Sequence, residues 1–345
     1  METANRRKKV SSPGYGIVAH PDGTITRIDV PKVSASSSSF TEGAASKDVT
    51  IHPPTGLWAR IFLPAPQSPP SKLPVLLYFH GGGFVMMSVA YRFYHSFFLR
   101  LCKSAKVIVI AVEYRLAPEH RLPAAHEDAL VSLQWLRSQA SIQQQGKSGV
   151  TLDSMSSIQS SPEPWLGEYA DFSRCYLMGD SAGGTMVHFL SLRIAEGLDI
   201  IPLRVCGQII VQPFFGGEER TATELRLVND EHVPLSGTDW LWRTCLPAGA
   251  DRDHPLANPF GPSSPDIKPL ARSLLPILFI VASGDPMLER QVKVFETLRE
   301  GGSQIRLVSY QGSHGSQLQS RPISESLFKD VASFIQSPLA FLSKL

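Results

Sequence analysis

The sequence predicts an α/β fold in which a mostly parallel, doubly wound sheet carries helices on both faces. Continuous apolar runs, such as "LPVLLYF" at 73–79 and "KVIVIAVEYR" at 106–115, have the length and β-branched content of strands that are buried on both faces. Between these runs, at 91–105 and 124–140, apolar residues recur at helical spacing. Strands that alternate with helices in this way predict a parallel sheet with right-handed crossovers.

The alternation continues toward the carboxyl end of the chain. One more strand is expected earlier, at 56–64. The later strands and helices are expected, in order, at 174–179, 184–197, 204–213, 275–285, 287–302 and 304–315, the last with the loop beyond it. Each strand is followed by a helix or a loop long enough to cross over the sheet, so these segments extend one sheet.

One α/β domain is expected over residues 46–345, and three segments depart from its regular pattern. Residues 1–45 are polar, include the serine-rich "SASSSSF", and are expected to form a flexible segment that contributes to a cap. Residues 139–164 are rich in Ser, Gln and Gly and are expected to form a surface loop, because strand patterns continue after them. The segment 214–265, rich in Pro, Gly and Trp, is expected to be an insertion above the sheet that completes the cap.

Composition and charge exclude several classes of protein. Of the 345 residues 43% are hydrophobic and 19% are charged, as in ordinary globular domains, and a net charge of +2 does not indicate nucleic acid as a partner. No apolar run approaches the roughly 18 residues that span a bilayer, and no secretory signal is expected. The four cysteines are far apart and are expected to be reduced core residues of a cytoplasmic protein. The basic cluster at 6–9 is expected to be a solvated tail, with a localisation signal, and hence the nucleus, as the alternative.

A serine stands between two glycines in "LMGDSAGGT", after an apolar strand and before a helix. The pattern G-x-S-x-G also occurs by chance, so its surroundings decide its meaning. A sharp strand-to-helix turn, with small residues two positions before and after the serine, holds the hydroxyl out over the sheet edge at the amino end of the helix. We therefore predict that Ser181 is a nucleophile rather than a surface hydroxyl in a turn.

A serine hydroxyl needs a base, and in this architecture the chain order is serine, acid, histidine. His314 follows the last predicted strand in a Gly/Ser-rich loop and is the predicted base. Structural, surface or pocket-wall roles are expected for His188, His232 and His254. Asp285 ends the preceding strand and is the predicted acid, which would orient the imidazole; a helix cap before "MLERQ" is the alternative.

Three glycines in "FHGGGF" follow a buried strand and predict an oxyanion hole. A loop that aims backbone N–H groups at a developing negative charge needs positions without side chains. The Ala182 N–H, beside the nucleophile, is expected to add a donor. We expect His80 to anchor this loop by a hydrogen bond rather than to act as a second base, and Gly83 to support the loop.

These motifs together resemble the plant carboxylesterases of the hormone-sensitive-lipase-like branch of the α/β-hydrolases. The resemblance rests on "HGGGF", "EYRLAPEHRLPAA", "DFSRCYLMGDSAGG", "PFFGGEERT" and "DRDHPLANPFGP", and it covers the chain from about residue 20 onward. It implies the α/β-hydrolase fold, a cap built from the amino-terminal segment and the insertion, and a serine carboxylesterase without metal or cofactor. It places the oxyanion donors at Gly81, Gly82 and Ala182.

The substrate that the resemblance implies is a small-molecule carboxylic ester, with a plant hormone or secondary-metabolite ester or lactone, such as a strigolactone, as the finer candidate. No nucleic acid, membrane or obligate protein partner is implied. Gibberellin receptors share the fold but lack the catalytic histidine, so a non-hydrolytic small-molecule receptor is the alternative, against which His314 argues. The chain departs from the family at Thr185, where Asn is usual, at Ser316, where Phe is usual, and in a longer 139–164 segment. The missing aromatic ring at Ser316 predicts a wider pocket wall.

Overall fold

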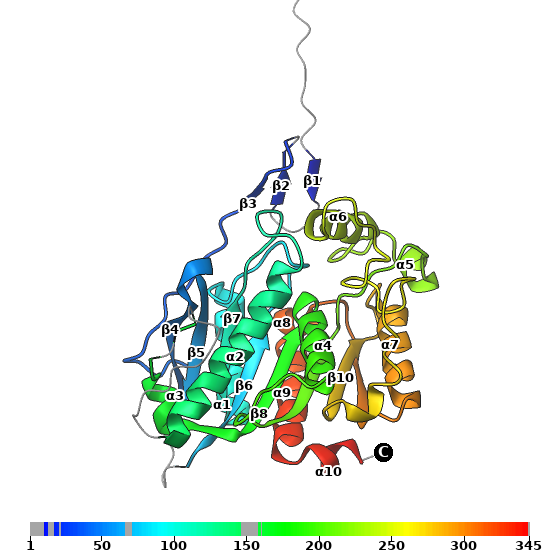
Figure 1. Ribbon diagram of the computed structural model, residues 1–345. Helices are drawn as coiled ribbons and strands as arrows, with labels where there is room; N and C mark the ends of the chain where they lie inside the picture. Colours follow the sequence, from blue (N-terminus) through cyan, green and yellow to red (C-terminus); the bar gives the residue numbers. More distant parts are fainter. Residues whose placement is uncertain are drawn as a thin grey trace, which may run out of the picture.

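An eight-stranded sheet forms the centre of the structure, a computed structural model that describes residues 10–12, 17–20, 22–65, 71–145, 158–159 and 161–343. The strand order is β11-β10-β9-β8-β6-β7-β5-β4 (Figure 1). The six strands from β11 to β7 pair in parallel, and β5 and β4 continue the sheet antiparallel at one edge. The mostly parallel, doubly wound sheet that the sequence predicts is confirmed.

The strands and helices follow one another closely along the chain. The strands of the sheet are β4 (Ala44–His52), β5 (Leu57–Pro64), β6 (Leu73–Phe79), β7 (Ile108–Glu113), β8 (Ala170–Asp180), β9 (Val205–Val211), β10 (Ile277–Ala282) and β11 (Ile305–Tyr310). The helices are α1 (Arg92–Ala105), α2 (Ala124–Gln145), α3 (Pro164–Tyr169), α4 (Ala182–Ala195), α5 (Ala222–Arg226), α6 (Leu235–Cys245), α7 (Leu288–Glu300), α8 (Ser316–Gln319), α9 (Arg321–Gln336) and α10 (Pro338–Leu342).

Two hydrophobic cores lie on the two faces of the sheet. Strand β6 contributes to both: Val75, Leu77 and Phe79 pack with α2, α4 and α7, whereas Leu76 and Tyr78 pack with α1 and α9. Successive side chains of a strand point to opposite faces, so a strand buried on both sides must be apolar throughout. This is why the continuous apolar runs of the sequence became the central strands.

The structure differs from the expected loop at 139–164, because α2 continues through Gln145. The serines in this part of the helix bond to carbonyls of the helix itself: Ser138 donates to the Trp135 carbonyl and Ser141 to the Arg137 carbonyl. Ala140 is buried. These polar residues therefore fit a helix, and α3 begins at Pro164, the last residue of the segment; most of the remainder lies outside the described residues.

The amino-terminal segment, expected to be flexible, contains regular structure in the part that is described. Strands β1 (Val10–Ser12), β2 (Ile17–Ala19) and β3 (Ile25–Arg27) form a small antiparallel sheet. Figure 1 places this sheet beside α6 at the end of the molecule where the loops after the parallel strands lie. Helices α5 and α6 belong to the insertion expected at 214–265, so both expected cap segments lie at this end.

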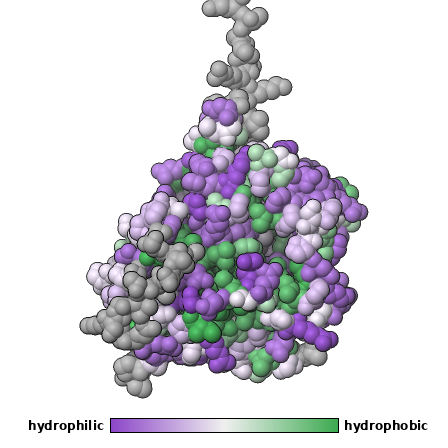
Figure 2. Space-filling view, in the orientation of Figure 1, coloured by the Kyte–Doolittle hydropathy of each residue, from purple (hydrophilic) through white to green (hydrophobic). Residues whose placement is uncertain are grey.

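The surface of the molecule is mixed in character. On the face shown in Figure 2, hydrophilic side chains cover most of the cap end, and hydrophobic side chains gather in the middle of the face. In the part of the chain that the structure describes, no helix is both long and apolar enough to cross a membrane.

Candidate active site

Ser181 lies at the turn between β8 and α4, in a strained backbone conformation with φ 51° and ψ −118°. Two glycines permit this turn. A Cβ at Gly179 would overlap the Gly183 carbonyl, and a Cβ at Gly183 would overlap the Phe79 carbonyl at the end of β6. Only glycine lets strand and helix approach so closely, and the turn holds the serine above the carboxyl end of the sheet.

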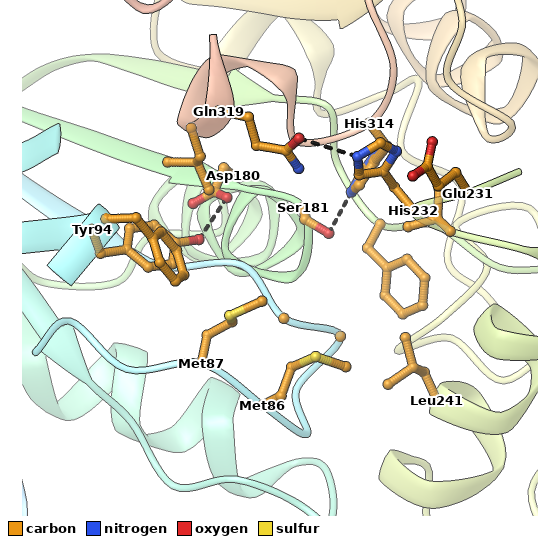
Figure 3. A pocket seen from close by; sticks show the side chains of 17 residues that line it. Met86, Met87, Tyr94, Asp180, Ser181, Glu231, His232, Leu241, His314 and Gln319 are labelled. Atoms are coloured by element: carbon orange, nitrogen blue, oxygen red, sulfur yellow. Dashed lines mark hydrogen bonds between the residues drawn. The ribbon is translucent and has the colours of Figure 1, made fainter. Parts of the chain in front are cut away.

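Three side chains from three loops meet at this turn. The Ser181 hydroxyl lies 2.9 Å from His314 Nε2 (Figure 3). On the other side of the imidazole, His314 Nδ1 lies 2.7 Å from Asp285 Oδ2. The carboxylate of Asp285 also accepts from the Met287 N–H at 2.9 Å, through Oδ1, and from the Gln291 amide at 2.8 Å, through Oδ2. Asp285 therefore holds the turn that leads into α7 and orients the imidazole at the same time. The N-cap residue of α7 is Met287, and its side chain does not cap this helix.

His314 is set up as a base. Burial alone would lower its pKa, but the charge and hydrogen bond of Asp285, with weaker contributions from Asp180 and Asp230, outweigh burial and raise the pKa of His314. In the tautomer with a proton on Nδ1, Nε2 is free to accept the serine proton. The Gln212 side chain at the end of β9 accepts from the Gly315 N–H at 2.7 Å and so holds the loop that carries the histidine.

The glycine loop, residues 80–87, leads from β6 past Ser181. The Gly81 N–H donates to the Tyr94 hydroxyl at 2.8 Å and to Asp180 Oδ1 at 3.0 Å. Because it is already used, it is not free to receive an oxyanion, and the expected donor role of Gly81 is corrected to an anchoring role. The resemblance placed the donor one residue too early, since the direction of an N–H group depends on contacts that the motif does not encode.

The free donors come from the following residues. The N–H groups of Gly82, Gly83 and Ala182 have no acceptor among the described residues. Gly82 and Gly83 line the same cavity as Ser181, and Ala182 is the first residue of α4, where N–H groups have no partner within the helix. These groups could stabilise a negative charge on an oxygen beside Ser181.

His80 is buried in the glycine loop. Its Nδ1 donates to the Gly81 carbonyl at 2.7 Å, and its ring stacks on Tyr114 at 4.3 Å between centroids. Burial lowers the pKa of His80 to about 4, against the opposing effect of the hydrogen bond to Gly81. A neutral, stacked imidazole supports the anchoring role expected for it.

The buried carboxylate of Asp180, beside the nucleophile, was not predicted from the sequence to belong to the site. Asp180 accepts hydrogen bonds from the hydroxyls of Tyr78, at 2.7 Å, and Tyr94, at 2.8 Å, besides the Gly81 N–H. Burial raises its pKa, while these donors act in the opposite direction. The signal was available in "GDSAGG", where a charged residue directly precedes the serine, but its partners lie far away in the chain.

A cavity of about 620 Å³ opens over Ser181 (Figure 3). Its apolar walls come from the glycine loop, from the neighbouring helices and from the cap insertion: Met86, Met87, Phe93, Phe214, Val233, Leu241 and Leu318. Polar groups stand at its rim, where His232 Nε2 lies 3.1 Å from the Gln319 side-chain oxygen and Glu231 is exposed. The cavity thus presents an apolar chamber with the serine and the histidine at its base.

The segment 214–265, which is expected to belong to a cap, contributes to this cavity. From the stretch Trp240–Trp242 it is Leu241 that lines the chamber, while Trp242 is buried behind it and stacks on Phe214 at 4.3 Å. Among the described residues none before Gly82 lines the cavity, so the described part of the amino-terminal segment does not form its wall. Ser316 is buried outside the lining, and Leu318 is the apolar residue that this loop supplies.

The remaining histidines stand apart from the triad. His188 is buried in α4 and its Nε2 has no hydrogen-bond partner, and the Nδ1 of His254 accepts from the Leu256 N–H in the cap. Thr185, one turn after the nucleophile, donates to the Phe214 carbonyl at 2.6 Å. The described residues form no group of three or more His, Cys, Asp or Glu that could hold a metal ion.

Comparison with known proteins points to one family. A family model of the alpha/beta hydrolase fold matches residues 76–317. The chain is 37% identical over 323 residues to the Probable carboxylesterase 8 of Arabidopsis thaliana, covering 93% of this chain and 92% of that protein. It is 34% identical over 299 residues to the 3-O-acetylpapaveroxine carboxylesterase CXE2 of Papaver somniferum, covering 84% and 90%. The gibberellin receptor GID1 of Oryza sativa subsp. japonica is 33% identical over 324 residues, covering 85% and 82%.

Solved structures give the same result for the fold. The thermophilic carboxylesterase EstE1, cloned from a metagenomic library, matches with a TM-score of 0.67 and 25% identity, covering 90% of this chain and 91% of that one. A fungal esterase from Rhizomucor miehei matches with a TM-score of 0.70 and 22% identity, covering 87% and 84%.

Proposed function

The chain belongs to the alpha/beta hydrolase fold family and is a carboxylic ester hydrolase, and we propose that it cleaves small-molecule esters through a covalent acyl-enzyme on Ser181. The observation that carries this proposal is the unbroken chain of hydrogen bonds from Ser181 through His314 to Asp285. Nucleophile, base and orienting acid are thereby in contact before any substrate arrives.

In the first half of the proposed reaction the Ser181 oxygen attacks the ester carbonyl carbon, and its proton passes to Nε2 of His314. The carbonyl oxygen becomes an oxyanion, which the N–H groups of Gly82, Gly83 and Ala182 stabilise. Asp285 stabilises the imidazolium that forms. The carbon–oxygen bond to the alcohol then breaks, and His314 returns its proton to the leaving alcohol.

In the second half a water molecule takes the place of the alcohol. His314 removes a proton from the water as its oxygen attacks the acyl carbon, and a second oxyanion occupies the same donors. The bond to Ser181 breaks, the serine recovers its proton from His314, and the carboxylic acid leaves. No step uses a metal or a cofactor.

The cavity supports a substrate of moderate size. A volume of about 620 Å³ lies in the range of sites for drug-sized molecules, and its walls are mainly apolar. We therefore propose an amphiphilic ester of a plant hormone or secondary metabolite, lactones such as strigolactones included. The relative named for 3-O-acetylpapaveroxine supports an O-acylated small molecule, and none of the relatives described above is named for a strigolactone.

The proposal extends to the location of the protein and to its partners. The four cysteines carry free thiols, three of them buried, which supports a cytoplasmic location. The reaction as proposed is complete within one chain, with a small-molecule ester as the partner and no obligate protein partner.

The receptor alternative has the relative GID1 in its favour. A receptor that binds without turnover needs neither a base on Ser181 nor an acid behind it, and both are in hydrogen-bond contact here. The carboxylesterase relatives and this contact favour the enzyme.

The test is turnover of p-nitrophenyl esters of increasing acyl length, together with labelling by a serine-directed organophosphate. We expect hydrolysis that stops on labelling, a mass increase on the peptide that contains Ser181, and an acyl-length profile that reports the size of the apolar chamber. Absence of both turnover and label, with retained binding of a small apolar hormone, would replace the proposal by the receptor.

A further inference from the structure

Arg27, the last residue of β3, reaches from the amino-terminal segment into the region behind the glycine loop. Its Nε donates to the Val85 carbonyl at 2.7 Å, and its Nη2 donates to the Ala117 carbonyl at 2.7 Å. Nη1 and Nη2 also hold the Glu119 carboxylate, each at 2.8 Å. The Arg27 side chain is only 26% exposed, and both carbonyls belong to buried residues. A guanidinium with this many charge-assisted bonds is held in one orientation.

One of the two carbonyls that Arg27 holds, that of Val85, belongs to the turn that follows the oxyanion glycines, and the other, that of Ala117, belongs to a loop bonded to this turn. The Val85 and Met86 N–H groups both donate to the Gly82 carbonyl, at 3.1 and 3.0 Å. The Ala117 N–H donates to the Phe84 carbonyl at 2.8 Å. Arg27 therefore holds the turn from Gly82 to Met86 directly at Val85 and, through Ala117, at the neighbouring Phe84.

The orientation of the Gly82 carbonyl sets the direction of an oxyanion donor. In a planar trans peptide the C=O and the following N–H point in opposite directions. The two N–H groups that hold the Gly82 carbonyl therefore also aim the Gly83 N–H, which belongs to the same peptide unit and lies in the lining of the cavity over Ser181. With φ of +111° at Gly82 and +59° at Gly83, the backbone here is flexible in itself and needs such external contacts.

No described residue before Gly82 lines the cavity, so Arg27 and the other described residues of the amino-terminal segment can act on the substrate only through intermediate residues. We propose that Arg27 is a positioning residue for the oxyanion hole: it couples the amino-terminal segment to the turn that aims the Gly83 N–H at the developing charge. This inference rests on the proposed acyl-enzyme function. It gives the described part of the segment a role in the transition state, although none of its residues lines the substrate chamber.

The test compares Arg27→Met and Arg27→Lys with Glu119→Gln as the matched control. Methionine keeps the apolar length of the side chain but donates nothing. Lysine offers a point charge that cannot serve both carbonyls in the fork geometry. Glu119→Gln weakens the exposed ion pair and leaves both carbonyl contacts in place, so it reports what the ion pair alone contributes.

Two measurements separate positioning from simple stability. The first is kcat and KM for p-nitrophenyl acetate. The second is inhibition by an alkyl trifluoromethyl ketone, whose adduct with Ser181 carries the oxyanion, against binding of the alcohol with the same carbon skeleton, which has none. Since outright loss of one donor costs about 10²–10³ in kcat, we expect Arg27→Met to lower kcat about tenfold to a hundredfold with little change in KM. Ketone inhibition should weaken by a similar factor, and alcohol binding should not change.

For Arg27→Lys an intermediate loss in kcat and ketone inhibition is expected, and for Glu119→Gln values close to the unchanged protein. If Arg27→Met does not fold, Arg27→Lys decides in its place. Equal weakening of ketone and alcohol, or an unchanged ratio of the two in both Arg27 variants, would overturn the inference. The proposed function fails separately, when the unchanged protein shows neither turnover nor labelling of Ser181.

Discussion

The Asp180 carboxylate accepts a hydrogen bond from the Gly81 N–H at 3.0 Å, although the two residues are 99 positions apart in the chain. The Tyr94 hydroxyl closes this contact into a triangle, because it accepts from the same N–H and donates to the other oxygen of Asp180. The residue directly before the nucleophile thus fixes the start of the glycine loop. Nucleophile and oxyanion donors are placed relative to each other by one buried charge.

Two tyrosine variants separate the effect of Asp180 on the position of the glycine loop from its effect on the stability of the fold. Tyr78→Phe and Tyr94→Phe each remove one donor to Asp180, and both side chains are buried. We expect each to lower the free energy of unfolding by about 1–3 kcal/mol. Only Tyr94→Phe also removes an acceptor of the Gly81 N–H, so only this variant should lower kcat, by about tenfold, less than the loss of a full donor. Equal kcat values in the two variants, measured well below their melting temperatures, would contradict the placement role.

The triad residues act as a unit. We expect Ser181→Ala and His314→Ala each to lower kcat by about 10⁴ or more, and the double variant to lose little further. His232→Asn is the control, since His232 lines the same cavity but is bonded to Gln319, and it should change KM more than kcat. Steady-state kinetics on one ester decide this; nearly unchanged turnover in Ser181→Ala would rule out the acyl-enzyme.

Asp285→Asn distinguishes the two contacts that Asp285 makes. An asparagine oxygen can still accept from the Met287 N–H, so the turn before α7 is retained, while the contact with His314 loses its charge. A fall in kcat near 10⁴ is expected, as for a tautomer error in other triads. A variant with nearly full activity and a lower melting temperature would leave Asp285 with the role of holding this turn alone.

The same variant predicts a change in pH dependence. The base acts only when neutral, so kcat/KM falls as the pH drops through the pKa of His314, which Asp285 raises above its usual 6.5 against the effect of burial. In Asp285→Asn the effect of burial remains without the opposing charge, and the acid limb of the pH profile should move to lower pH. A limb that stays in place would mean that it reports another group.

Buried neutral histidines predict acid sensitivity of the fold. Burial lowers the pKa of His80, His126 and His188 to about 4 each, although a hydrogen bond opposes this at His80. Below about pH 6.5 the unfolded chain takes up protons that the folded chain refuses until about pH 4. The contribution of these neutral histidines to the free energy of unfolding is therefore complete above pH 6.5 and is lost as the pH falls to about 4. The loss is about 1.4 kcal/mol per pH unit for each histidine. Urea unfolding at a series of pH values measures the slope of the free energy of unfolding against pH. His126→Gln should reduce this slope by the equivalent of one proton, and an unchanged slope would contradict a neutral, buried His126.

Much of the fold could be predicted from the sequence because its central strands are buried on both faces. Val75 to Phe79 are apolar without interruption, and this pattern has few other interpretations. Strand β4 was not predicted, since "AASKDVTIH" lies at the sheet edge and alternates between buried and exposed positions with charged residues among them. Helix α2 was predicted too short because Ser and Gln at its end suggested a loop, while their side chains bond within the helix or to a neighbouring segment.

The residues of the candidate site likewise divide into those that could be predicted from the sequence and those that could not. Ser181, Asp285 and His314 each follow a recognisable strand. Local pattern and chain order were therefore enough to assign the three residues to one catalytic site. Arg27 and Asp180 act through partners 58 to 102 positions away, and nothing local marks such contacts. The choice among the glycines failed for the same reason, since the Gly81 N–H is consumed by Tyr94 and Asp180.

The last prediction uses two neighbouring glycines whose added methyl groups would meet different obstacles. At Gly82 a Cβ would overlap the Met86 backbone carbonyl, and φ of +111° disfavours any side chain. At Gly83 the φ of +59° is one that other residues adopt at modest cost, and the nearest atom is the Leu241 side chain at 2.7 Å. A backbone obstacle can be relieved only by moving the turn that aims the oxyanion donors, whereas a side-chain obstacle can be removed by a second substitution.

We therefore expect Gly82→Ala to lower kcat by about 10²–10³, as the loss of a donor does, and Leu241→Ala not to rescue it. Gly83→Ala should push Leu241 into the cavity and raise KM for esters with long acyl chains, with a smaller effect on kcat for the acetate. Because Leu241→Ala vacates the space that the new methyl group needs, the double variant Gly83→Ala/Leu241→Ala should recover most of that loss. Leu241→Ala alone is the control for the widened chamber. Rescue of Gly82→Ala by Leu241→Ala would show that the cap side chain, and not the direction of the backbone donors, limits the reaction.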